Sequence, residues 1–110
     1  MNLVIDVIEE DMKSKVILSG EIDAYTAPKL KENLLPLTLK KDTTVEVNLE
    51  EVGYMDSTGL GVFISALKST NEHNSHLTLI NLQERVLRLF KITGLNEIMD
   101  ISEEIRGGKE

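Results

Sequence analysis

Hydrophobic and polar residues alternate along several short stretches of the chain, and a period of two predicts β-strands. The stretches with this character are residues 3–8, 15–19, 44–49 and 77–80, with a short final strand or extended segment over 98–101. A charged break at residues 9–12 lies between the first two strands, which are only six residues apart. Because this gap is short, we expect these two strands to form an antiparallel hairpin.

Three helices are predicted between the later strands, where apolar residues recur at intervals of three and four positions. The first follows Thr26 as its capping residue, accepts Pro28 in its first turn, and ends or kinks at Pro36. Its buried side is marked by Leu30, Leu34 and Leu37. The second helix covers residues 58–70, and its apolar stripe consists of Leu60, Phe63, Ile64 and Leu67.

The third helix is expected to begin after Asn81, because Glu84 three residues later gives a capping arrangement, and to run through Phe90. Gly94 follows as its C-terminal stop. One last helical turn is expected over residues 102–106. The order strand–strand–helix–strand–helix–strand–helix–strand–helix predicts an α/β fold, with helices packed on a mixed sheet and right-handed crossovers.

The 110 residues suffice for one domain with one core, which we expect over residues 1–106, with 107–110 as a flexible tail. No apolar run approaches the roughly 18 residues of a membrane span. We expect no secretory signal from these N-terminal residues, and the lack of cysteine fits a cytosolic protein. A net charge of -7 repels nucleic acid and anionic lipid, so any effect on transcription requires another protein. The same charge also keeps a domain soluble.

The stretch around which these elements are arranged lies between the third strand and the second helix. It reads Gly53-Tyr54-Met55-Asp56-Ser57-Thr58-Gly59-Leu60-Gly61-Val62-Phe63. Asp56 or Ser57 can cap the helix. Gly59 and Gly61, however, each cost about 1 kcal/mol relative to alanine in a helix. Two such glycines in the first turn indicate bare backbone that something else approaches closely.

Asp56-Ser57-Thr58-Gly59-Leu60-Gly61 resembles the central motif of the anti-sigma-factor antagonists, the small bacterial members of the STAS domain family. A second, weaker motif lies upstream as Gly20-Glu21-Ile22-Asp23, followed by Ala27-Pro28 and Leu30. Together the two motifs extend the resemblance over nearly the whole chain. Among these antagonists, the chain is most similar to those of the general-stress response, which act on sigma-B.

The resemblance implies a STAS fold and a regulatory binding protein that works by partner switching in the cytoplasm, as a monomer. The unphosphorylated form would bind an anti-sigma factor that is also a serine kinase, and so free the sigma factor. Phosphorylation of Ser57 would end binding, and a PP2C-type phosphatase would reverse it. Thr58 is a second possible acceptor, but the family motif favours Ser57. The residues expected to contact the partner are Asp23, Asp56, Ser57, Thr58, Gly59, Leu60 and Gly61.

An enzyme is not expected, because the residues near Ser57 supply no catalytic base, and no cofactor is implied. His73 and His76 follow the second helix, more than about 20 Å of helix away from Ser57. They lack further ligands for a metal, and the glycines match neither a Walker loop nor a dinucleotide fingerprint. The alternative function is a nucleotide- or small-anion-binding module, as STAS domains fused to anion transporters are thought to be.

Several roles stay open at this level. Asp23 and Asp56 both follow strands, so they could lie at one edge of the sheet and contact a partner, or each could only cap a helix. Leu60 could belong to the core or to the contact surface. Tyr54 and Met55 are expected to pack against the domain rather than to form a ligand face.

Overall fold

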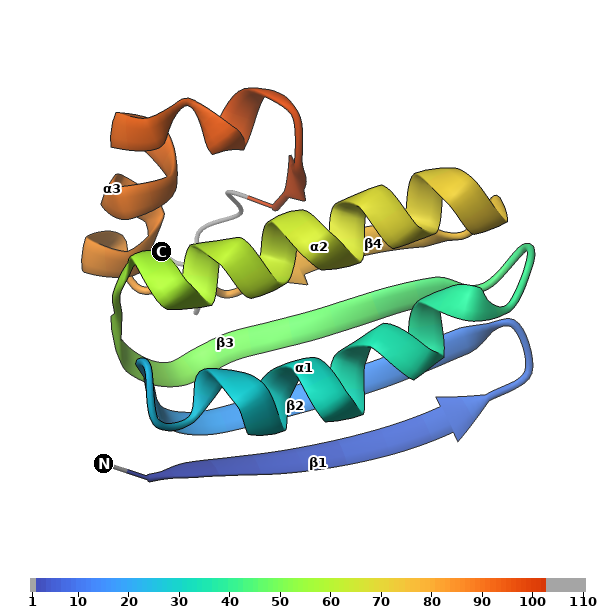
Figure 1. Cartoon of the computed structure of the whole chain (residues 1–110), viewed down its shortest axis with the longest axis horizontal. Coiled ribbons are helices and arrows are strands. Elements are labelled where there is room, and N and C mark those ends of the chain that lie inside the picture. The colour runs from blue at the N-terminus through green and yellow to red at the C-terminus, as the bar shows by residue number, and fades with distance from the viewer. Residues whose placement is uncertain (1, 103–110) are drawn as a thin grey trace, which may run out of the picture.

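One mixed sheet of five strands runs through the molecule in the order β1-β2-β3-β4-β5 (Figure 1). The structure is a computed structural model and describes residues 2–102. The strands are β1 (Leu3–Glu10), β2 (Lys13–Ile22), β3 (Thr44–Met55), β4 (His76–Ile80) and β5 (Asp100–Ile101). β1 and β2 form the antiparallel hairpin that the short charged gap predicts, whereas all later neighbours pair in parallel. The predicted mixed α/β architecture is therefore confirmed.

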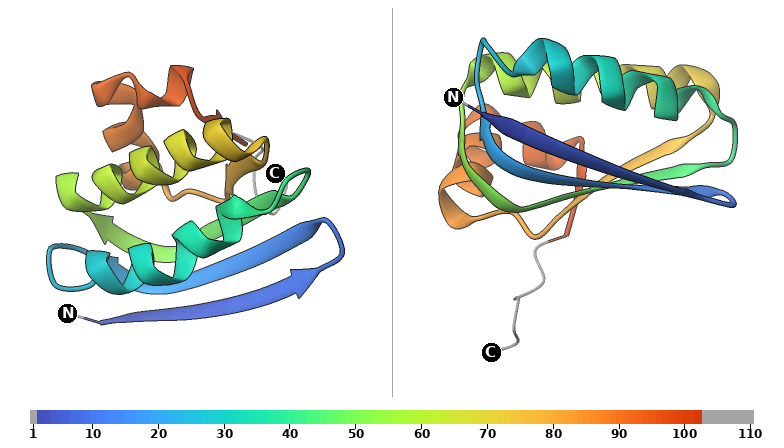
Figure 2. Two further views of the ribbon diagram at one scale, coloured as in Figure 1. Left: turned by 45° about the vertical axis from the view of Figure 1, so that its right-hand side comes forward. Right: turned by 90° about the horizontal axis from the view of Figure 1, so that it is seen from below.

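The helices alternate with the parallel strands. They are α1 (Ala27–Leu34), α2 (Ser57–His73) and α3 (Glu84–Thr93); the 3-10 turn η1 (Leu35–Leu39) follows α1, and the 3-10 turn η2 (Leu95–Glu97) follows α3. Figure 2 shows α1 and α2 lying over the same face of the sheet. Of the last predicted helical turn, residues 103–106 lie outside the described residues, as does the predicted tail at 107–110.

The core fills the space between the helices and the covered face of the sheet. Leu30 and Leu34 of α1 are fully buried, which confirms the predicted stripe, while Leu37 lies partly buried in η1. Phe63 of α2 and Phe90 of α3 contact each other with ring centroids 6.1 Å apart, a separation typical of favourable aromatic pairs. This contact attaches α3 to the same core as α2.

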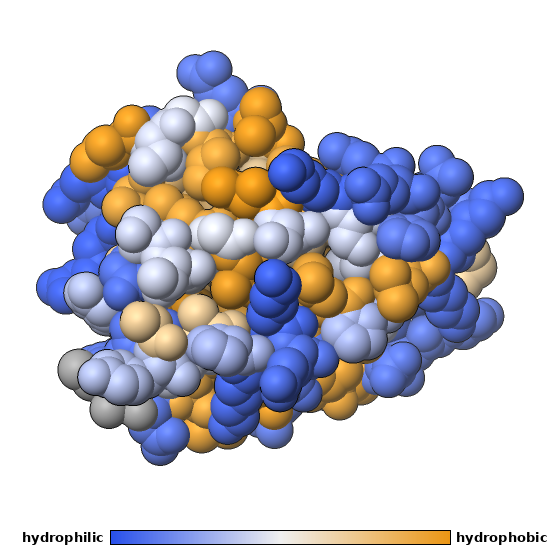
Figure 3. Space-filling model, in the orientation of Figure 1, coloured by the Kyte–Doolittle hydropathy of each residue, from blue (hydrophilic) through white to orange (hydrophobic). Residues whose placement is uncertain are grey.

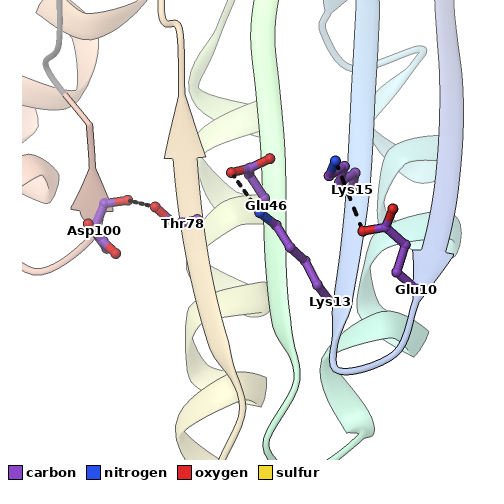
Figure 4. A network of polar contacts seen from close by, with 6 residues as sticks. All are labelled: Glu10, Lys13, Lys15, Glu46, Thr78 and Asp100. Carbon is purple, nitrogen blue, oxygen red and sulfur yellow. Dashed lines mark hydrogen bonds and ion pairs between the residues drawn. The ribbon is translucent and has the colours of Figure 1, made fainter.

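The opposite face of the sheet carries charged residues instead. Lys13 pairs with Glu46 at 3.4 Å and Lys15 with Glu10 at 4.0 Å, and Figure 4 shows these side chains together on that face. Exposed pairs of this kind contribute about 0–1 kcal/mol each. The space-filling view of the helix side differs: hydrophobic residues gather over α3 and in the band between α1 and α2 (Figure 3).

β3 is longer than predicted, because it continues past residue 49 to Met55. Its pairing with β2 shifts register twice, between Ile17 and Ser19 and between Gly20 and Glu21. Each shift places an extra residue on β3, which is the arrangement of a β-bulge. The buried positions consequently change from alternation to a spacing of three, at Leu49, Val52 and Met55.

Several predicted boundaries were wrong. β1 continues through Glu9 and Glu10, and β2 begins at Lys13 and continues to Ile22 instead of covering only residues 15–19. α2 continues to His73 and ends at Asn74, whose positive φ of 56° leaves only a short turn before β4. The predicted end of this helix at residue 70 was therefore three residues short.

The helix ends also differ in part from the predictions. α3 begins after Gln83, and Asn81 has a φ of 60° and caps nothing. Gly94 ends α3 with a φ of 78°, as predicted. Thr26 occupies the capping position of α1 but forms no side-chain cap. Its hydroxyl instead donates to the backbone oxygen of Glu21 at 2.8 Å, because the loop before α1 uses it internally.

Candidate partner-binding site

Two connections between strands and helices lie side by side at the carboxyl ends of β2 and β3. The first runs from Asp23 to Thr26 and leads from β2 to α1, and the second is Asp56, between β3 and α2. The backbone N–H of Asp56 donates to the carbonyl oxygen of Ile22 at 3.1 Å, which joins the two connections directly. Asp23 and Asp56 therefore lie at one edge of the sheet, which the sequence had left as a possibility.

The first connection is held by its own polar groups. Oδ1 of Asp23 accepts hydrogen bonds from the backbone N–H groups of Tyr25 at 2.9 Å and Thr26 at 3.1 Å. The N–H of Asp23 donates in turn to the Thr26 hydroxyl at 2.9 Å. The Asp23 side chain is only 7% exposed. Asp23 thus shapes the loop, and Tyr25 projects from it with 87% of its surface exposed.

The second connection is a helix cap. Asp56 has extended backbone and accepts a hydrogen bond from the N–H of Thr58 at 3.0 Å, as an N-cap residue does. The Thr58 hydroxyl donates to the same carboxylate oxygen. These hydrogen bonds, above all that from the Thr58 hydroxyl, lower the pKa of Asp56 below its ordinary value. Asp56 is therefore negatively charged at neutral pH.

Ser57 is the first residue of α2, and its side chain is exposed. Its hydroxyl has no hydrogen-bond partner among the described residues, whereas the neighbouring Thr58 hydroxyl is bound to Asp56. The cap therefore holds one hydroxyl and leaves the other available to a second molecule.

The two glycines of the first turn differ sharply. A Cβ atom on Gly59 would lie 2.7 Å from Cγ2 of Ile22 and 2.7 Å from Cγ of Met55. Gly59 thus allows α2 to pack closely on β2 and β3. The group that approaches its bare backbone is part of this chain and not of a partner. Gly61 is exposed, and a Cβ there would meet nothing within 4 Å. Leu60 is 5% exposed and belongs to the core.

Two hollows flank Ser57 on either side. The first, which we call the tyrosine pocket, has a volume of about 280 Å³ and is lined by Glu21, Asp23, Ala24, Tyr25, Tyr54 and Asp56. The second, the interhelical groove, has a volume of about 330 Å³ and is lined by Ala24, Ala27, Pro28, Lys31, Thr58 and Val62. Since Asp56 lines one and Thr58 the other, Ser57 lies between an acidic, aromatic hollow and a largely apolar one.

Sequence reasoning missed part of this surface. Met55 is buried, as expected, but Tyr54 is 46% exposed and lines the tyrosine pocket. Glu21 and Tyr54 are paired across β2 and β3, and Tyr25 completes the pocket from the first connection. One signal was available: all three residues lie within two positions of Asp23 or Asp56, which were expected to lie together.

The histidines lie at the other end of α2 from this surface, His73 as its last residue and His76 as the first residue of β4. His73 ends α2, where its Nδ1 lies 2.8 Å from the backbone oxygen of Ser69, and His76 pairs with Asp100 at 2.7 Å. Within residues 2–102, no three His, Cys, Asp or Glu side chains are grouped so that they could hold a metal ion. Over the same residues, no helix is long and apolar enough to cross a membrane.

The chain is thus an α/β domain with an exposed serine at the N-terminus of a capped helix. Comparison with known proteins identifies its class, because the sequence matches the STAS domain over residues 4–107. The chain belongs to the STAS domain family.

Two relatives within that family carry the same description. The anti-sigma-B factor antagonist of Listeria monocytogenes is 48% identical over 102 residues, which cover 92% of this chain and 90% of that protein. The anti-sigma-B factor antagonist of Bacillus subtilis is 45% identical over 108 residues, which cover 98% of each chain. The predicted resemblance to the sigma-B antagonists is confirmed.

Solved structures agree at the level of the fold. An anti-sigma factor antagonist from Mycobacterium paratuberculosis superposes with a TM-score of 0.82 at 21% identity, covering 96% of this chain and 90% of that one. The unphosphorylated form of the anti-sigma factor antagonist SpoIIAA superposes with a TM-score of 0.71 at 14% identity, covering 94% and 92%. At identities this low, the superpositions show a common fold and only that.

Proposed function

We propose that this chain is an anti-sigma factor antagonist whose binding is switched off by phosphorylation of Ser57. The observation that carries the proposal is the free, exposed hydroxyl of Ser57 between two hollows. The names of relatives that are 45–48% identical along nearly the whole chain support it. In this role the unphosphorylated protein binds an anti-sigma factor in the cytoplasm, as a monomer, and so frees the sigma factor for transcription.

The anti-sigma factor is itself the serine kinase in this proposal. Oγ of Ser57 attacks the γ-phosphorus of ATP, the bond to the bridging β–γ oxygen breaks, ADP leaves, and the serine proton passes to a base of the kinase. A PP2C-type phosphatase later hydrolyses the ester with water and releases inorganic phosphate. Ser57 is favoured over Thr58 because the Thr58 hydroxyl is already bound to Asp56. This chain is the substrate in both reactions.

The phosphate should change the surface and leave the fold intact. It adds about -1.5 to -2 charges at neutral pH, and the positive end of α2 favours a negative charge by about 0.3–1 kcal/mol. The N–H groups of Gly59 and Leu60 already donate to the backbone carbonyl oxygen of Asp56. The negatively charged side chain of Asp56 repels the phosphate. The net effect on stability is therefore small, while bulk and desolvation disrupt an interface that fits a neutral hydroxyl.

The test is to measure binding of the anti-sigma factor kinase from the same organism to four forms of this chain: unmodified, phosphorylated, Ser57→Ala and Ser65→Ala. Ser65 lies on the same helix and serves as the control. We expect phosphorylation to lower affinity at least a hundredfold, equivalent to about 3 kcal/mol. Ser57→Ala should bind but accept no phosphate from ATP, while mass spectrometry should find phosphate on Ser57 of the Ser65→Ala variant. Equal binding of the phosphorylated and unmodified forms would refute the switch.

A further inference from the structure

We propose that β1 receives an extended, basic segment of another protein, which joins the sheet as an additional strand. β1 forms one outer edge of the sheet, with β2 beside it and no described strand on its other side (Figure 1). Ser57 follows β3, and β2 separates β3 from β1. The inference therefore goes beyond the proposed function and does not depend on it.

Half of the backbone groups of β1 face away from the sheet. In an antiparallel pair, every second residue exchanges hydrogen bonds with the neighbouring strand. The carbonyl oxygen of Asn2 accepts the N–H of Glu21 at 2.9 Å, so the even-numbered residues of β1 bind β2 and the odd-numbered ones face outward. At Leu3 the outward carbonyl oxygen accepts a hydrogen bond from Nζ of Lys29 at 2.8 Å. The other outward N–H and C=O groups belong to Ile5, Val7 and Glu9.

β1 lacks most of the features that block an edge strand in natural sheets. Such edges are commonly protected by lysine, proline, a bulge or a very short strand. β1 has eight residues, contains no lysine or proline, and pairs with β2 without a shift of register. By contrast, β5 at the opposite edge has only two residues. β1 is therefore the long, regular edge that the sheet offers to a further strand.

Apolar side chains lie on both faces of this edge. Val4, Val7 and Ile8 are 36–50% exposed. Since side chains alternate along a strand, Val4 and Ile8 lie on the open face of the sheet and Val7 on the helix side. A strand added beside β1 would cover apolar surface on both faces.

The charge of β1 selects the kind of segment. β1 contains Asp6, Glu9 and Glu10 and no basic residue. Glu10 has Lys15 at 4.0 Å, but β2 places uncharged residues directly across from Asp6 and Glu9. None of the ion pairs in the described part of the chain reaches either of these two carboxylates. Because opposite charges across a strand pair are favourable, lysine or arginine fits opposite Asp6 and Glu9.

Other occupants fit this edge less well. Two β1 strands side by side would place three carboxylates of each chain along one seam, and each chain has a net charge of -7. The same charge disfavours nucleic acid and anionic lipid. Strand addition draws its affinity from main-chain hydrogen bonds and its specificity from side chains. The occupant that meets both requirements is a polypeptide in which apolar and basic residues are mixed.

The direct test is an NMR titration of the isotopically labelled chain with the acetylated and amidated peptide Lys-Lys-Val-Val-Lys-Val-Thr. When this peptide lies antiparallel to β1, its second and fifth residues, both lysine, lie opposite Glu9 and Asp6. We expect saturable shifts at millimolar peptide, together with slower hydrogen exchange, for the backbone amides of Ile5, Val7 and Glu9. The same peptide with glutamate in place of every lysine should not bind.

Two N-methylated forms of the lysine peptide show whether the backbone makes the contact. Methyl groups on the second, fourth and sixth nitrogens replace the N–H groups that face β1. Methyl groups on the third, fifth and seventh nitrogens replace those that face solvent, and the two forms have the same charge and composition. We expect the first form to lose binding and the second to keep it. Equal binding of both forms would overturn the assignment, because side chains alone would then make the contact.

Variants of β1 give the matching test on the protein. Val7→Pro removes an outward N–H at a place where an edge strand tolerates proline, and it should abolish binding. Asp6→Asn combined with Glu9→Gln removes two exposed charges and should weaken binding about threefold to tenfold. Glu72→Gln, at an exposed position of α2, should leave binding unchanged. The result for the charge variant stands even if Val7→Pro does not fold.

Two further outcomes would overturn the inference. If the lysine peptide causes no saturable shift, the acidic residues of β1 serve only to keep the edge from pairing. If sedimentation shows a dimer of the unmodified chain that Val7→Pro dissociates, the edge belongs to a second copy instead of a basic segment. Neither outcome bears on the proposed function, whose test is the affinity of the Ser57 forms for the anti-sigma factor kinase.

Discussion

The two strand-to-helix connections at the edge of the sheet each contain an aspartate, yet the fold uses them differently. Asp23 is buried, and its carboxylate oxygen accepts two backbone N–H groups of its own loop. Asp56 is more exposed and accepts one backbone N–H and one hydroxyl at the start of α2. The hydrogen bonds of Asp23 therefore fix the conformation of the first connection, in which Tyr25 points outward. The second is a helix cap that leaves the Ser57 hydroxyl free. An aspartate therefore fixes the loop conformation in the first connection, and in the second it caps the helix that exposes Ser57.

The largest expected effect tests how tightly the second connection is attached to the sheet. In Gly59→Ala, the new Cβ lies 2.7 Å from both Ile22 and Met55, so two buried side chains must move. We expect the free energy of unfolding to fall by about 1–3 kcal/mol, as for other overpacked cores. Urea denaturation measures this. A variant as stable as the unmodified chain would show that α2 can move away from the sheet at little cost.

The second expected effect compares the two aspartates directly. Asp23→Ala removes a buried acceptor from two N–H groups, so we expect a loss of about 1–2 kcal/mol. Asp56→Ala removes an exposed cap and should cost about 1 kcal/mol or less. Thermal melting and kinase binding should be measured on both variants. A larger stability loss for Asp56→Ala would reverse the roles assigned here, and unchanged affinity for both would remove them from the partner surface.

Part of this site could not be predicted from the sequence, because β3 contains two bulges. Its alternation was readable over 44–49, but the two bulges change the spacing of buried residues to three, at Leu49, Val52 and Met55. A bulge depends on the neighbouring strand, so no local pattern reveals it. As a result, the outward direction of Tyr54 could not be predicted from its own strand.

Gly59 shows the opposite case, in which a usable signal was present. The glycines were expected to serve an outside partner, because their cost to a helix has no local explanation. Yet Gly59, Phe63, Ala66 and Thr70 follow one another at helical spacing, and all are buried. The stripe of Phe63 thus extends back to Gly59. Gly61 lies off that stripe, so helical periodicity alone could have separated the two glycines.

The third expected effect therefore concerns Gly61, which the fold itself does not require. Gly61→Ala should raise the free energy of unfolding by up to about 1 kcal/mol, because alanine favours the helix and the new Cβ meets nothing within 4 Å. If a partner approaches this backbone closely, the same variant should bind the kinase more weakly, with Ser65→Ala as the control. A more stable variant with full affinity would show that no partner contacts Gly61.

The smallest expected effect is the pH dependence of the cap. The pKa of Asp56 is lowered, mainly by the Thr58 hydroxyl and further by backbone N–H groups. A carboxyl group whose pKa is lower in the folded state stabilises the fold above its unfolded pKa, and this contribution disappears as the pH falls through the folded pKa. Thr58→Val removes the hydroxyl at nearly constant shape, so the pKa should rise towards its ordinary value, whereas Thr58→Ser should keep it low. Carbon-13 NMR titration of the Asp56 carboxyl measures both. Equal pKa values in the two variants would show that the backbone N–H groups alone hold the charge, and that the Thr58 hydroxyl is as available to a kinase as that of Ser57.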